Sequence, residues 1–135
     1  MINVVIDTNV IISSMLSPNG TPSKVVAIIL EVDEFNIIYS NEMLKEYKKV
    51  LAYRKLNIDT ETQHQFLYTI KDAGIVITPA PSSIQMRDET DRVFYDTAKA
   101  SNSVLITGNK KDYPNESFIM SPSEFISYVG FSGCG

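Results

Sequence analysis

The chain of 135 residues contains one cysteine, one histidine and no tryptophan. Cys134 has no second cysteine to pair with, which excludes an internal disulfide, and its place near the chain end does not favour a buried thiol nucleophile. A zinc site needs several cysteine or histidine ligands, and this composition does not supply them. His64 lies between two glutamines, a setting typical of a helix surface rather than of a catalytic base.

Long apolar segments are also missing. The longest apolar run, Val25 to Leu30, is far shorter than the roughly 20 residues that cross a bilayer. The N-terminus lacks the basic region and apolar core of a signal peptide, so we expect a cytoplasmic protein with no membrane association. The hydrophobic fraction of 44% is ordinary for a globular protein. We therefore predict one domain over residues 1–129, followed by a frayed tail over 130–135.

Positive charge is scarce overall. The formal net charge is −4 and the sequence pI is about 4.9, which argues against a surface that attracts nucleic acid everywhere. The cations are nevertheless clustered, at Lys45, Lys48, Lys49, Arg54 and Lys55, and again at Lys110 and Lys111. These clusters indicate local basic patches, or alternatively the solvated face of a helix.

Apolar segments rich in β-branched residues alternate with helical patterns along the chain. Strands are predicted at 2–6, 35–39, 75–78 and 104–107, with a fifth that includes 118–120. Helices are predicted at 8–16, 21–31, 41–53, 59–73, from the acidic residues 88–91 to about 101, and from 121 to about 128. This alternation requires right-handed crossovers, so it predicts a three-layer α/β/α sandwich with a mainly parallel five-stranded sheet.

Polar residues suited to helix ends support these boundaries. Thr21, followed by a proline, is expected to cap the second helix, and Ser40 the third. Asp59 can cap a further helix that Gly74 ends. The segment 121–124 is a capping box for the last helix.

Acidic and amide side chains follow the predicted strands where these strands end. Asp7 directly follows the first strand, and Asp91 begins the helix that leads into the fourth. Asn109 and Asp112 come just after the fourth strand. In an open parallel sheet the functional cleft lies beyond the carboxyl ends of the strands, so we expect these side chains to face one cleft.

Glu46 is the further acid that we expect at this cleft. It lies at the border of the apolar stripe of its helix, whereas Glu42, one turn earlier, lies further into solvent. Several carboxylates in one cleft repel one another unless a proton or a cation neutralises them. Oxygen ligands suit Mg²⁺ or Mn²⁺, and such an ion can promote hydrolysis of a phosphodiester. For the acids at 88–91, a favourable interaction with the helix dipole is the alternative explanation.

Three motifs, in this order along the chain, resemble those of PIN-domain ribonucleases. The residues Val4-Val5-Ile6-Asp7-Thr8-Asn9-Val10 resemble the opening motif of that family. Residues 40–51 resemble its helix with an internal glutamate, and residues 87–98 with 105–109 resemble its closing acidic region. The resemblance implies a five-stranded parallel sheet with helices on both faces. It also implies an Mg²⁺- or Mn²⁺-dependent endoribonuclease that leaves a 5′-phosphate and a 3′-hydroxyl.

The resemblance also implies roles for individual residues and partners. Asp7, Glu46 and Asp91 take the positions of the metal-binding, catalytic acids, and Asn9 and Thr107 those of supporting polar groups. Family members are often the toxin of a toxin–antitoxin pair and often form homodimers, so RNA, a small separate antitoxin protein and a second copy are the expected partners.

Asn109 departs from the family pattern. Many members carry an aspartate directly after the Thr-Gly of the fourth strand, and asparagine offers a carbonyl oxygen without charge, which leaves a second metal in question. Asp112 or Asp96 could compensate, although both are expected at the surface. Asp88 is the alternative to Asp91 if the acidic loop aligns differently.

Other classes of small α/β protein fit less well. A phosphoacceptor receiver needs an aspartate at the end of the third strand, where this chain has Thr78-Pro79. A haloacid-dehalogenase-like phosphatase needs a second aspartate at the position of Asn9, and no glycine-rich phosphate loop supports an NTPase. The alternative that remains is a PIN-like domain without catalysis that binds RNA or protein, motivated by Asn109 and the acidic overall charge.

Overall fold

A parallel sheet of five strands forms the centre of the molecule in the computed structural model, which describes residues 1–130. The strand order is β3-β2-β1-β4-β5. The strands are β1 (Ile2–Ile6), β2 (Phe35–Tyr39), β3 (Ile75–Val76), β4 (Val104–Ile106) and β5 (Ile119–Met120). The central strand β1 pairs with β2 on one side and with β4 on the other.

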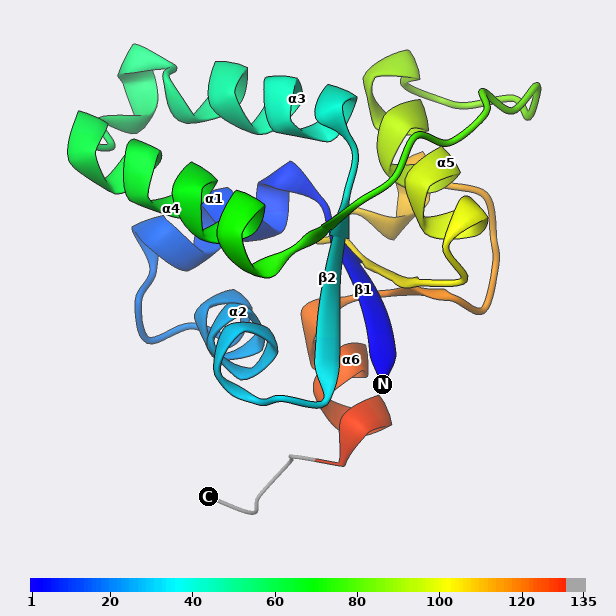
Figure 1. Ribbon diagram of the computed structural model, residues 1–135, viewed down its shortest axis with the longest axis horizontal. Helices are drawn as coiled ribbons and strands as arrows, with labels where there is room; N and C mark the ends of the chain where they lie inside the picture. The colour runs from blue at the N-terminus through cyan, green and yellow to red at the C-terminus, as the bar shows by residue number, and fades with distance from the viewer. Residues whose placement is uncertain (131–135) are drawn as a thin grey trace.

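Helices cover both faces of this sheet. They are α1 (Thr8–Leu16), α2 (Thr21–Glu31), α3 (Asn41–Leu51), α4 (Thr60–Ala73), α5 (Arg92–Ala100) and α6 (Pro122–Val129), with short 3-10 turns η1 (Arg54–Leu56), η2 (Glu89–Asp91) and η3 (Lys110–Asp112). Figure 1 shows α1, α2 and α4 on one side of the sheet, α5 on the other, and α3 across the ends of the strands. The predicted three-layer α/β/α class is therefore confirmed.

The sheet centre is apolar on both faces. Val4, Val5 and Ile6 of β1 are buried, as are Leu105 and Ile106 of β4, which pair with Val5 and Ile6. Burying a side chain of this size stabilises the fold by about 1.5–3 kcal/mol. The continuous apolar runs therefore place β1 and β4 in the middle of the sheet, with their carboxyl ends side by side.

Most of the predicted helix starts are confirmed. Ser40 Oγ accepts a hydrogen bond from the Met43 amide at 3.2 Å, and Asp59 Oδ1 accepts one from Thr62 at 2.8 Å. The capping box at the start of α6 is also present. The prediction for Thr21 is wrong, because Gly20 is the extended residue before α2 and Thr21 is already helical. The proline after Thr21 is therefore the second residue of the first turn. Its missing N–H removes no hydrogen bond, because N–H groups in the first turn have no partner within the helix.

Several elements are shorter than predicted. The strand expected at 75–78 pairs only at Ile75 and Val76, because its partner β2 ends at Tyr39, where the chain turns into α3. Helix α3 ends at Leu51 rather than at residue 53. The acidic stretch before α5 forms the 3-10 turn η2, so α5 begins only at Arg92.

Gly74 ends α4, as predicted, for a steric reason. A Cβ atom at this position would lie 2.5 Å from the Ile70 carbonyl oxygen and 2.8 Å from Cδ1 of Tyr39. Only glycine allows such close approach. The chain can therefore turn from α4 directly into β3 beside Tyr39.

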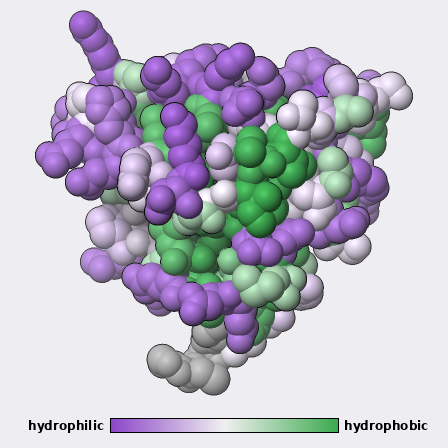
Figure 2. Space-filling model, viewed as in Figure 1, coloured by the Kyte–Doolittle hydropathy of each residue, from purple (hydrophilic) through white to green (hydrophobic). Residues whose placement is uncertain are grey.

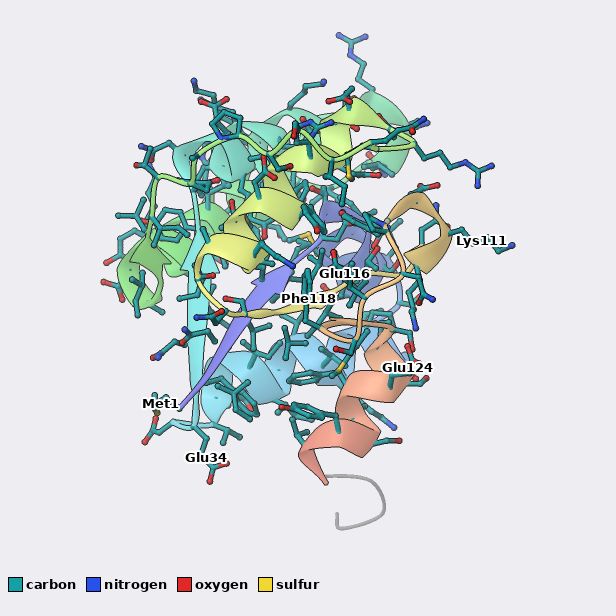
Figure 3. The ribbon with its side chains drawn as sticks, turned by 90° about the vertical axis from the view of Figure 1, so that its right-hand side faces the viewer. Met1, Glu34, Lys111, Glu116, Phe118 and Glu124 are labelled. Carbon is teal, nitrogen blue, oxygen red and sulfur yellow. The ribbon has the colours of Figure 1, made fainter. Side chains whose placement is uncertain are left out.

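The segment before β5 is bound to α5 by side-chain contacts. Tyr95 donates a hydrogen bond to Glu116, and Lys99 Nζ lies 2.9 Å from Glu116 Oε1. The Lys99 ammonium also lies 5.4 Å from the ring centre of Phe118. Figure 3 shows Glu116 and Phe118 close together beneath α5, whereas Lys111 projects outward at the margin. These contacts hold the edge strand β5 against the sheet.

Two further expectations concern the chain as a whole. Among residues 1–130, the structure contains no helix with the length and apolar character needed to cross a membrane. The tail predicted at 130–135 falls, apart from Gly130, outside the described residues, as does Cys134. The single domain over 1–129 stays a prediction.

We expect Ser40→Ala to lower the free energy of unfolding by about 1–2 kcal/mol, because the change removes the cap of α3 from a buried site. Ser40 Oγ also lies 3.2 Å from Thr97 Oγ1, but the Thr97 hydroxyl keeps the Val93 carbonyl as its acceptor at 2.7 Å, so the loss falls on the Met43 amide. Urea unfolding measures the change. The matched control is Ser121→Ala, which removes a more accessible cap and should cost about 0.5–1 kcal/mol. An equal loss in both variants would contradict this account of α3.

Candidate functional site

Asp7 lies at the carboxyl end of β1 and is only 5% exposed. Its backbone N–H donates to the Ile106 carbonyl at 2.9 Å, which continues the pairing with β4. Its Oδ2 accepts hydrogen bonds from Thr107 Oγ1 at 2.9 Å and from the Tyr113 hydroxyl at 2.8 Å. The end of the central strand thus holds a carboxylate in one orientation.

Asn9 and the residues after β4 form a network around this carboxylate. Thr107 Oγ1 accepts hydrogen bonds from Asn9 Nδ2 at 3.4 Å and from the backbone N–H of Asn109 at 3.1 Å. Asn9 Oδ1 in turn accepts from the Gly108 amide at 2.9 Å. The structure therefore brings Asn9 and Thr107 together beside Asp7.

Tyr113 is a residue of this network that sequence reasoning missed. It is a buried aromatic residue directly after η3, and a single aromatic residue in a loop gives no periodic pattern. Burial and the neighbouring Asp7 charge raise the pKa of the Tyr113 hydroxyl, so it remains a donor. The one sequence feature that could have suggested a role for Tyr113 is its position directly after Asp112, a predicted site residue.

Helix α3 brings Glu46 toward the same region. The neighbouring Tyr47 hydroxyl donates to the Ile6 carbonyl, which ties α3 to the end of β1. The Glu46 side chain is half-buried, with Oε2 3.9 Å from Lys49 Nζ. Glu42, one turn earlier, is exposed and pairs with Lys45 at 3.2 Å.

Asp91 completes the set of acids, at the junction of η2 and α5. Asp7, Glu46 and Asp91 line one cleft, which has a volume of about 370 Å³. Thr8 and Asn9 contribute to the same wall. The structure therefore gathers three acids, far apart in the chain, around one hollow beyond the sheet.

Burial raises the pKa of Asp7 and of Asp91, and neighbouring acids add to the shift at Asp91. Burial raises the pKa of Asp7, although its hydrogen bonds to Tyr113 and Thr107 act in the opposite direction. Burial, followed by the charges of Asp7, Asp88, Asp112 and Glu46, raises the pKa of Asp91 to about 7. Near neutral pH the cleft therefore favours uptake of a proton or of a cation.

The chemistry of this cleft fits a hard divalent cation, although its side chains do not form a closed ligand set. Within residues 1–130, no three or more histidine, cysteine, aspartate or glutamate side chains are grouped closely enough to hold a metal ion. The available ligand atoms are carboxylate oxygens, which Mg²⁺ and Mn²⁺ prefer. Thr8 Oγ1 is a further buried oxygen, without a hydrogen-bond partner among the described residues.

The remaining candidate acids lie outside this cleft. Asp88 is exposed and caps η2 through the Thr90 amide. Asp112 Oδ2 accepts from Asn109 Nδ2 at 2.6 Å, so these two residues pair with each other. The expectation that Asp96 lies at the surface is wrong, because it is only 7% exposed. The loop over α5 covers it, and its Oδ2 accepts from the Ser82 amide at 3.1 Å.

Comparison with known proteins identifies the family. The PIN domain family matches residues 3–111. The chain belongs to this family. An uncharacterized protein of Methanocaldococcus jannaschii is 34% identical over 112 residues, which cover 81% of this chain and 72% of that protein.

Two solved structures share the PIN fold of this chain. One is VapBC2 of Rickettsia felis bound to a DNA fragment from its promoter, with a TM-score of 0.56 and 14% identity, covering 89% of this chain and 97% of the matched chain. The other is VapBC-1 of nontypeable Haemophilus influenzae, with a TM-score of 0.56 and 18% identity, covering 82% and 90%. At these identities the likeness concerns the fold.

We expect Asp91→Asn to stabilise the metal-free protein by roughly 1–2 kcal/mol at about pH 8. The folded protein raises the pKa of Asp91 from 3.8 to about 7, so between these values it keeps a proton that the unfolded chain has lost. Asp91 therefore destabilises the folded protein more and more as pH rises from about 4 toward 7. Each pKa unit corresponds to about 1.4 kcal/mol, reduced here because solvent screens a half-buried group.

Urea unfolding in EDTA, at about pH 4 and about pH 8, measures this difference. The difference between variant and parent should nearly vanish at the lower pH. The matched control is Asp33→Asn, which changes an exposed acid that does not line the cleft. A constant difference at both pH values would contradict the electrostatic account.

Proposed function

We propose that this PIN domain protein is a metal-dependent endoribonuclease that hydrolyses RNA phosphodiester bonds. In this proposal Asp7, Glu46 and Asp91 are the catalytic acids and hold Mg²⁺ or Mn²⁺. The observation that carries it is the cleft lined by these carboxylates, in which burial, followed by neighbouring charges that include Asp7 and Glu46, raises the pKa of Asp91. Membership of the PIN domain family supports the reaction class.

The residues of the chain prepare the site in two ways. Thr107 and Tyr113 orient the Asp7 carboxylate through two hydrogen bonds, and Asn9 supports Thr107. Asp91 holds a proton near neutral pH until a cation displaces it, because ligand oxygens must be deprotonated. The bound ion would lower the pKa of a water molecule and offset charge on the phosphate.

The proposed reaction exchanges one bond at phosphorus for another. An oxygen atom of water forms a bond to phosphorus while the bond from phosphorus to the 3′ oxygen breaks. One proton of the water ends on that 3′ oxygen. The products are a 5′-phosphate and a 3′-hydroxyl.

Asn109 and Asp112 are assigned supporting roles in this proposal. Asn109 supplies no charge, and its amide group donates to Asp112 at 2.6 Å. The Asp112 charge nevertheless contributes to the raised pKa of Asp91. We therefore place this pair at the edge of the site, where it adds to the negative potential.

A second candidate function is RNA or protein binding without catalysis. It is favoured by Asn109 and by the open arrangement of the acids, since no closed ligand group is present among residues 1–130. The two functions differ in whether they depend on divalent metal. The enzyme needs the metal for cleavage, whereas the binding module retains its ligand in EDTA and cleaves nothing.

We also propose a small antitoxin, encoded as a separate chain, and a homodimer as the assembly formed by the domain over residues 1–129. The support is the fold shared with the VapBC structures. Co-expression with the product of a neighbouring small reading frame tests the antitoxin, and light scattering of the purified protein tests the dimer. A monomer that copurifies with no such product would contradict both.

Asp7→Asn should reduce metal-dependent cleavage of single-stranded RNA by roughly 100-fold or more. Changes beside metal ligands already cost about 10- to 100-fold, and this substitution removes a charge from the proposed ligand itself. The assay follows a labelled RNA with Mn²⁺ and then with excess EDTA. The exposed Asp33, changed to asparagine, is the matched control and should cleave at the parent rate.

Thermal unfolding with and without Mn²⁺ separates binding of the metal from catalysis. The parent protein should gain stability as Mn²⁺ saturates the site, and Asp7→Asn should gain much less. RNA binding without cleavage under every metal condition would instead support the non-catalytic module.

A further inference from the structure

A groove between α3 and α4 contains Lys45 and Lys48 of the predicted basic cluster, together with Lys71 of α4. Its lining residues include Asn41, Glu42, Lys45 and Lys48 of α3, and Tyr68 and Lys71 of α4. The two helices contact each other directly. Its volume is about 780 Å³, within the roughly 300–1,000 Å³ of ligand sites.

The groove has the opposite charge to the protein as a whole. It contains three lysines and one acid, and Glu42 is paired with Lys45 at 3.2 Å. Within residues 1–130, neither Lys48 nor Lys71 forms an ion pair. In a chain with net charge −4, these ammonium groups make a local positive site that attracts a polyanion.

An exposed aromatic ring lies beside these cations. Tyr68 is 68% exposed, although an aromatic ring of this size normally gains stability from burial. Stacking of an unpaired base on an aromatic ring, with phosphates held by nearby cations, is the common way to bind single-stranded nucleic acid. Tyr68 with Lys48 and Lys71 provides both parts.

The groove and the acidic cleft both border α3, and a second hollow lies between them. Asn41, Glu42 and Lys45 line both the groove and a second hollow between α3 and α5. Glu46 lines that second hollow and also the acidic cleft. In Figure 2, hydrophilic side chains crowd the upper part of the surface, where Figure 1 places α3 and α4.

We propose that the groove between α3 and α4 binds single-stranded RNA that flanks the cleavage point. Lys48 and Lys71 hold its phosphates, and one base stacks on Tyr68. This inference rests on the proposed function, because it assumes an RNA substrate that enters the acidic cleft. It adds a substrate requirement, namely an unpaired segment long enough to reach from Glu46 across Lys45 to Tyr68.

Fluorescence anisotropy with labelled oligouridylates of roughly 4 and roughly 16 nucleotides tests the groove in EDTA. Tyr68→Ala should weaken binding of the longer RNA roughly 10-fold, because it removes the ring on which one base stacks. A double variant, Lys48→Gln with Lys71→Gln, should also weaken it and reduce the salt slope by about 1.4 for two phosphates. The shorter RNA is the comparison substrate for the cleavage assay with Mn²⁺, because in EDTA the acids of the cleft repel its phosphates.

Matched controls lie elsewhere on the surface. Tyr128, which is 56% exposed on α6, is changed to alanine, and the exposed Lys24 on α2 to glutamine. Both controls should bind the longer RNA like the parent protein. Unchanged binding in the groove variants, or an equal loss in the controls, overturns the proposal. Binding of a polyglutamate peptide that depends on Lys48 and Lys71, with RNA binding unchanged, would instead assign the groove to a protein partner.

Cleavage assays distinguish failure of this inference from failure of the proposed function. With Mn²⁺, the groove variants should cleave the shorter RNA at the parent rate and the longer RNA more slowly at low concentration. Equal cleavage of both lengths by parent and variants would overturn the groove and leave the nuclease intact. Absence of cleavage in every protein would reject the nuclease, while binding in EDTA would still report on the groove.

Discussion

The candidate site depends on a carboxylate buried at the end of the central strand. Asp7 follows the central strand of the sheet, and its own amide continues the pairing of that strand with β4. Burial of a charged group is costly unless hydrogen bonds compensate it. Thr107 and Tyr113 provide that compensation from the loop after β4, and this loop is consequently part of the site. A change to either donor therefore affects stability as well as chemistry.

The acids that line the cleft together with Asp7 make it strongly negative. Tyr47 ties α3 to the end of β1 and thereby places Glu46 beside the cleft, while the start of α5 places Asp91 opposite. Together with burial, the charges around Asp91 raise its pKa to about 7. Such a cluster of acids destabilises the metal-free protein, and binding of a cation would remove the repulsion between them. The stability that these acids cost the empty protein is thus linked to the affinity for metal that we propose.

Much of the fold and part of the site could be predicted from the sequence. Apolar runs and helix caps such as Ser40 are local features, and parallel topology puts Asp7 near the residues that follow β4. The errors have long-range causes. Asp96 is buried because a loop folds over α5, and Tyr113 reaches Asp7 across 106 positions of sequence. Strand β3 is short because β2 ends at Tyr39. None of these contacts leaves a periodic pattern in the sequence.

We propose that Asp7, Glu46 and Asp91 jointly hold one divalent cation. Anomalous diffraction from crystals soaked in Mn²⁺ is the decisive measurement. A manganese peak is expected in the cleft, with oxygens of these carboxylates at coordination distances of about 2.0–2.6 Å or bridged to the ion by water. A well-diffracting soaked crystal with no peak there, or with manganese bound only elsewhere, would contradict it.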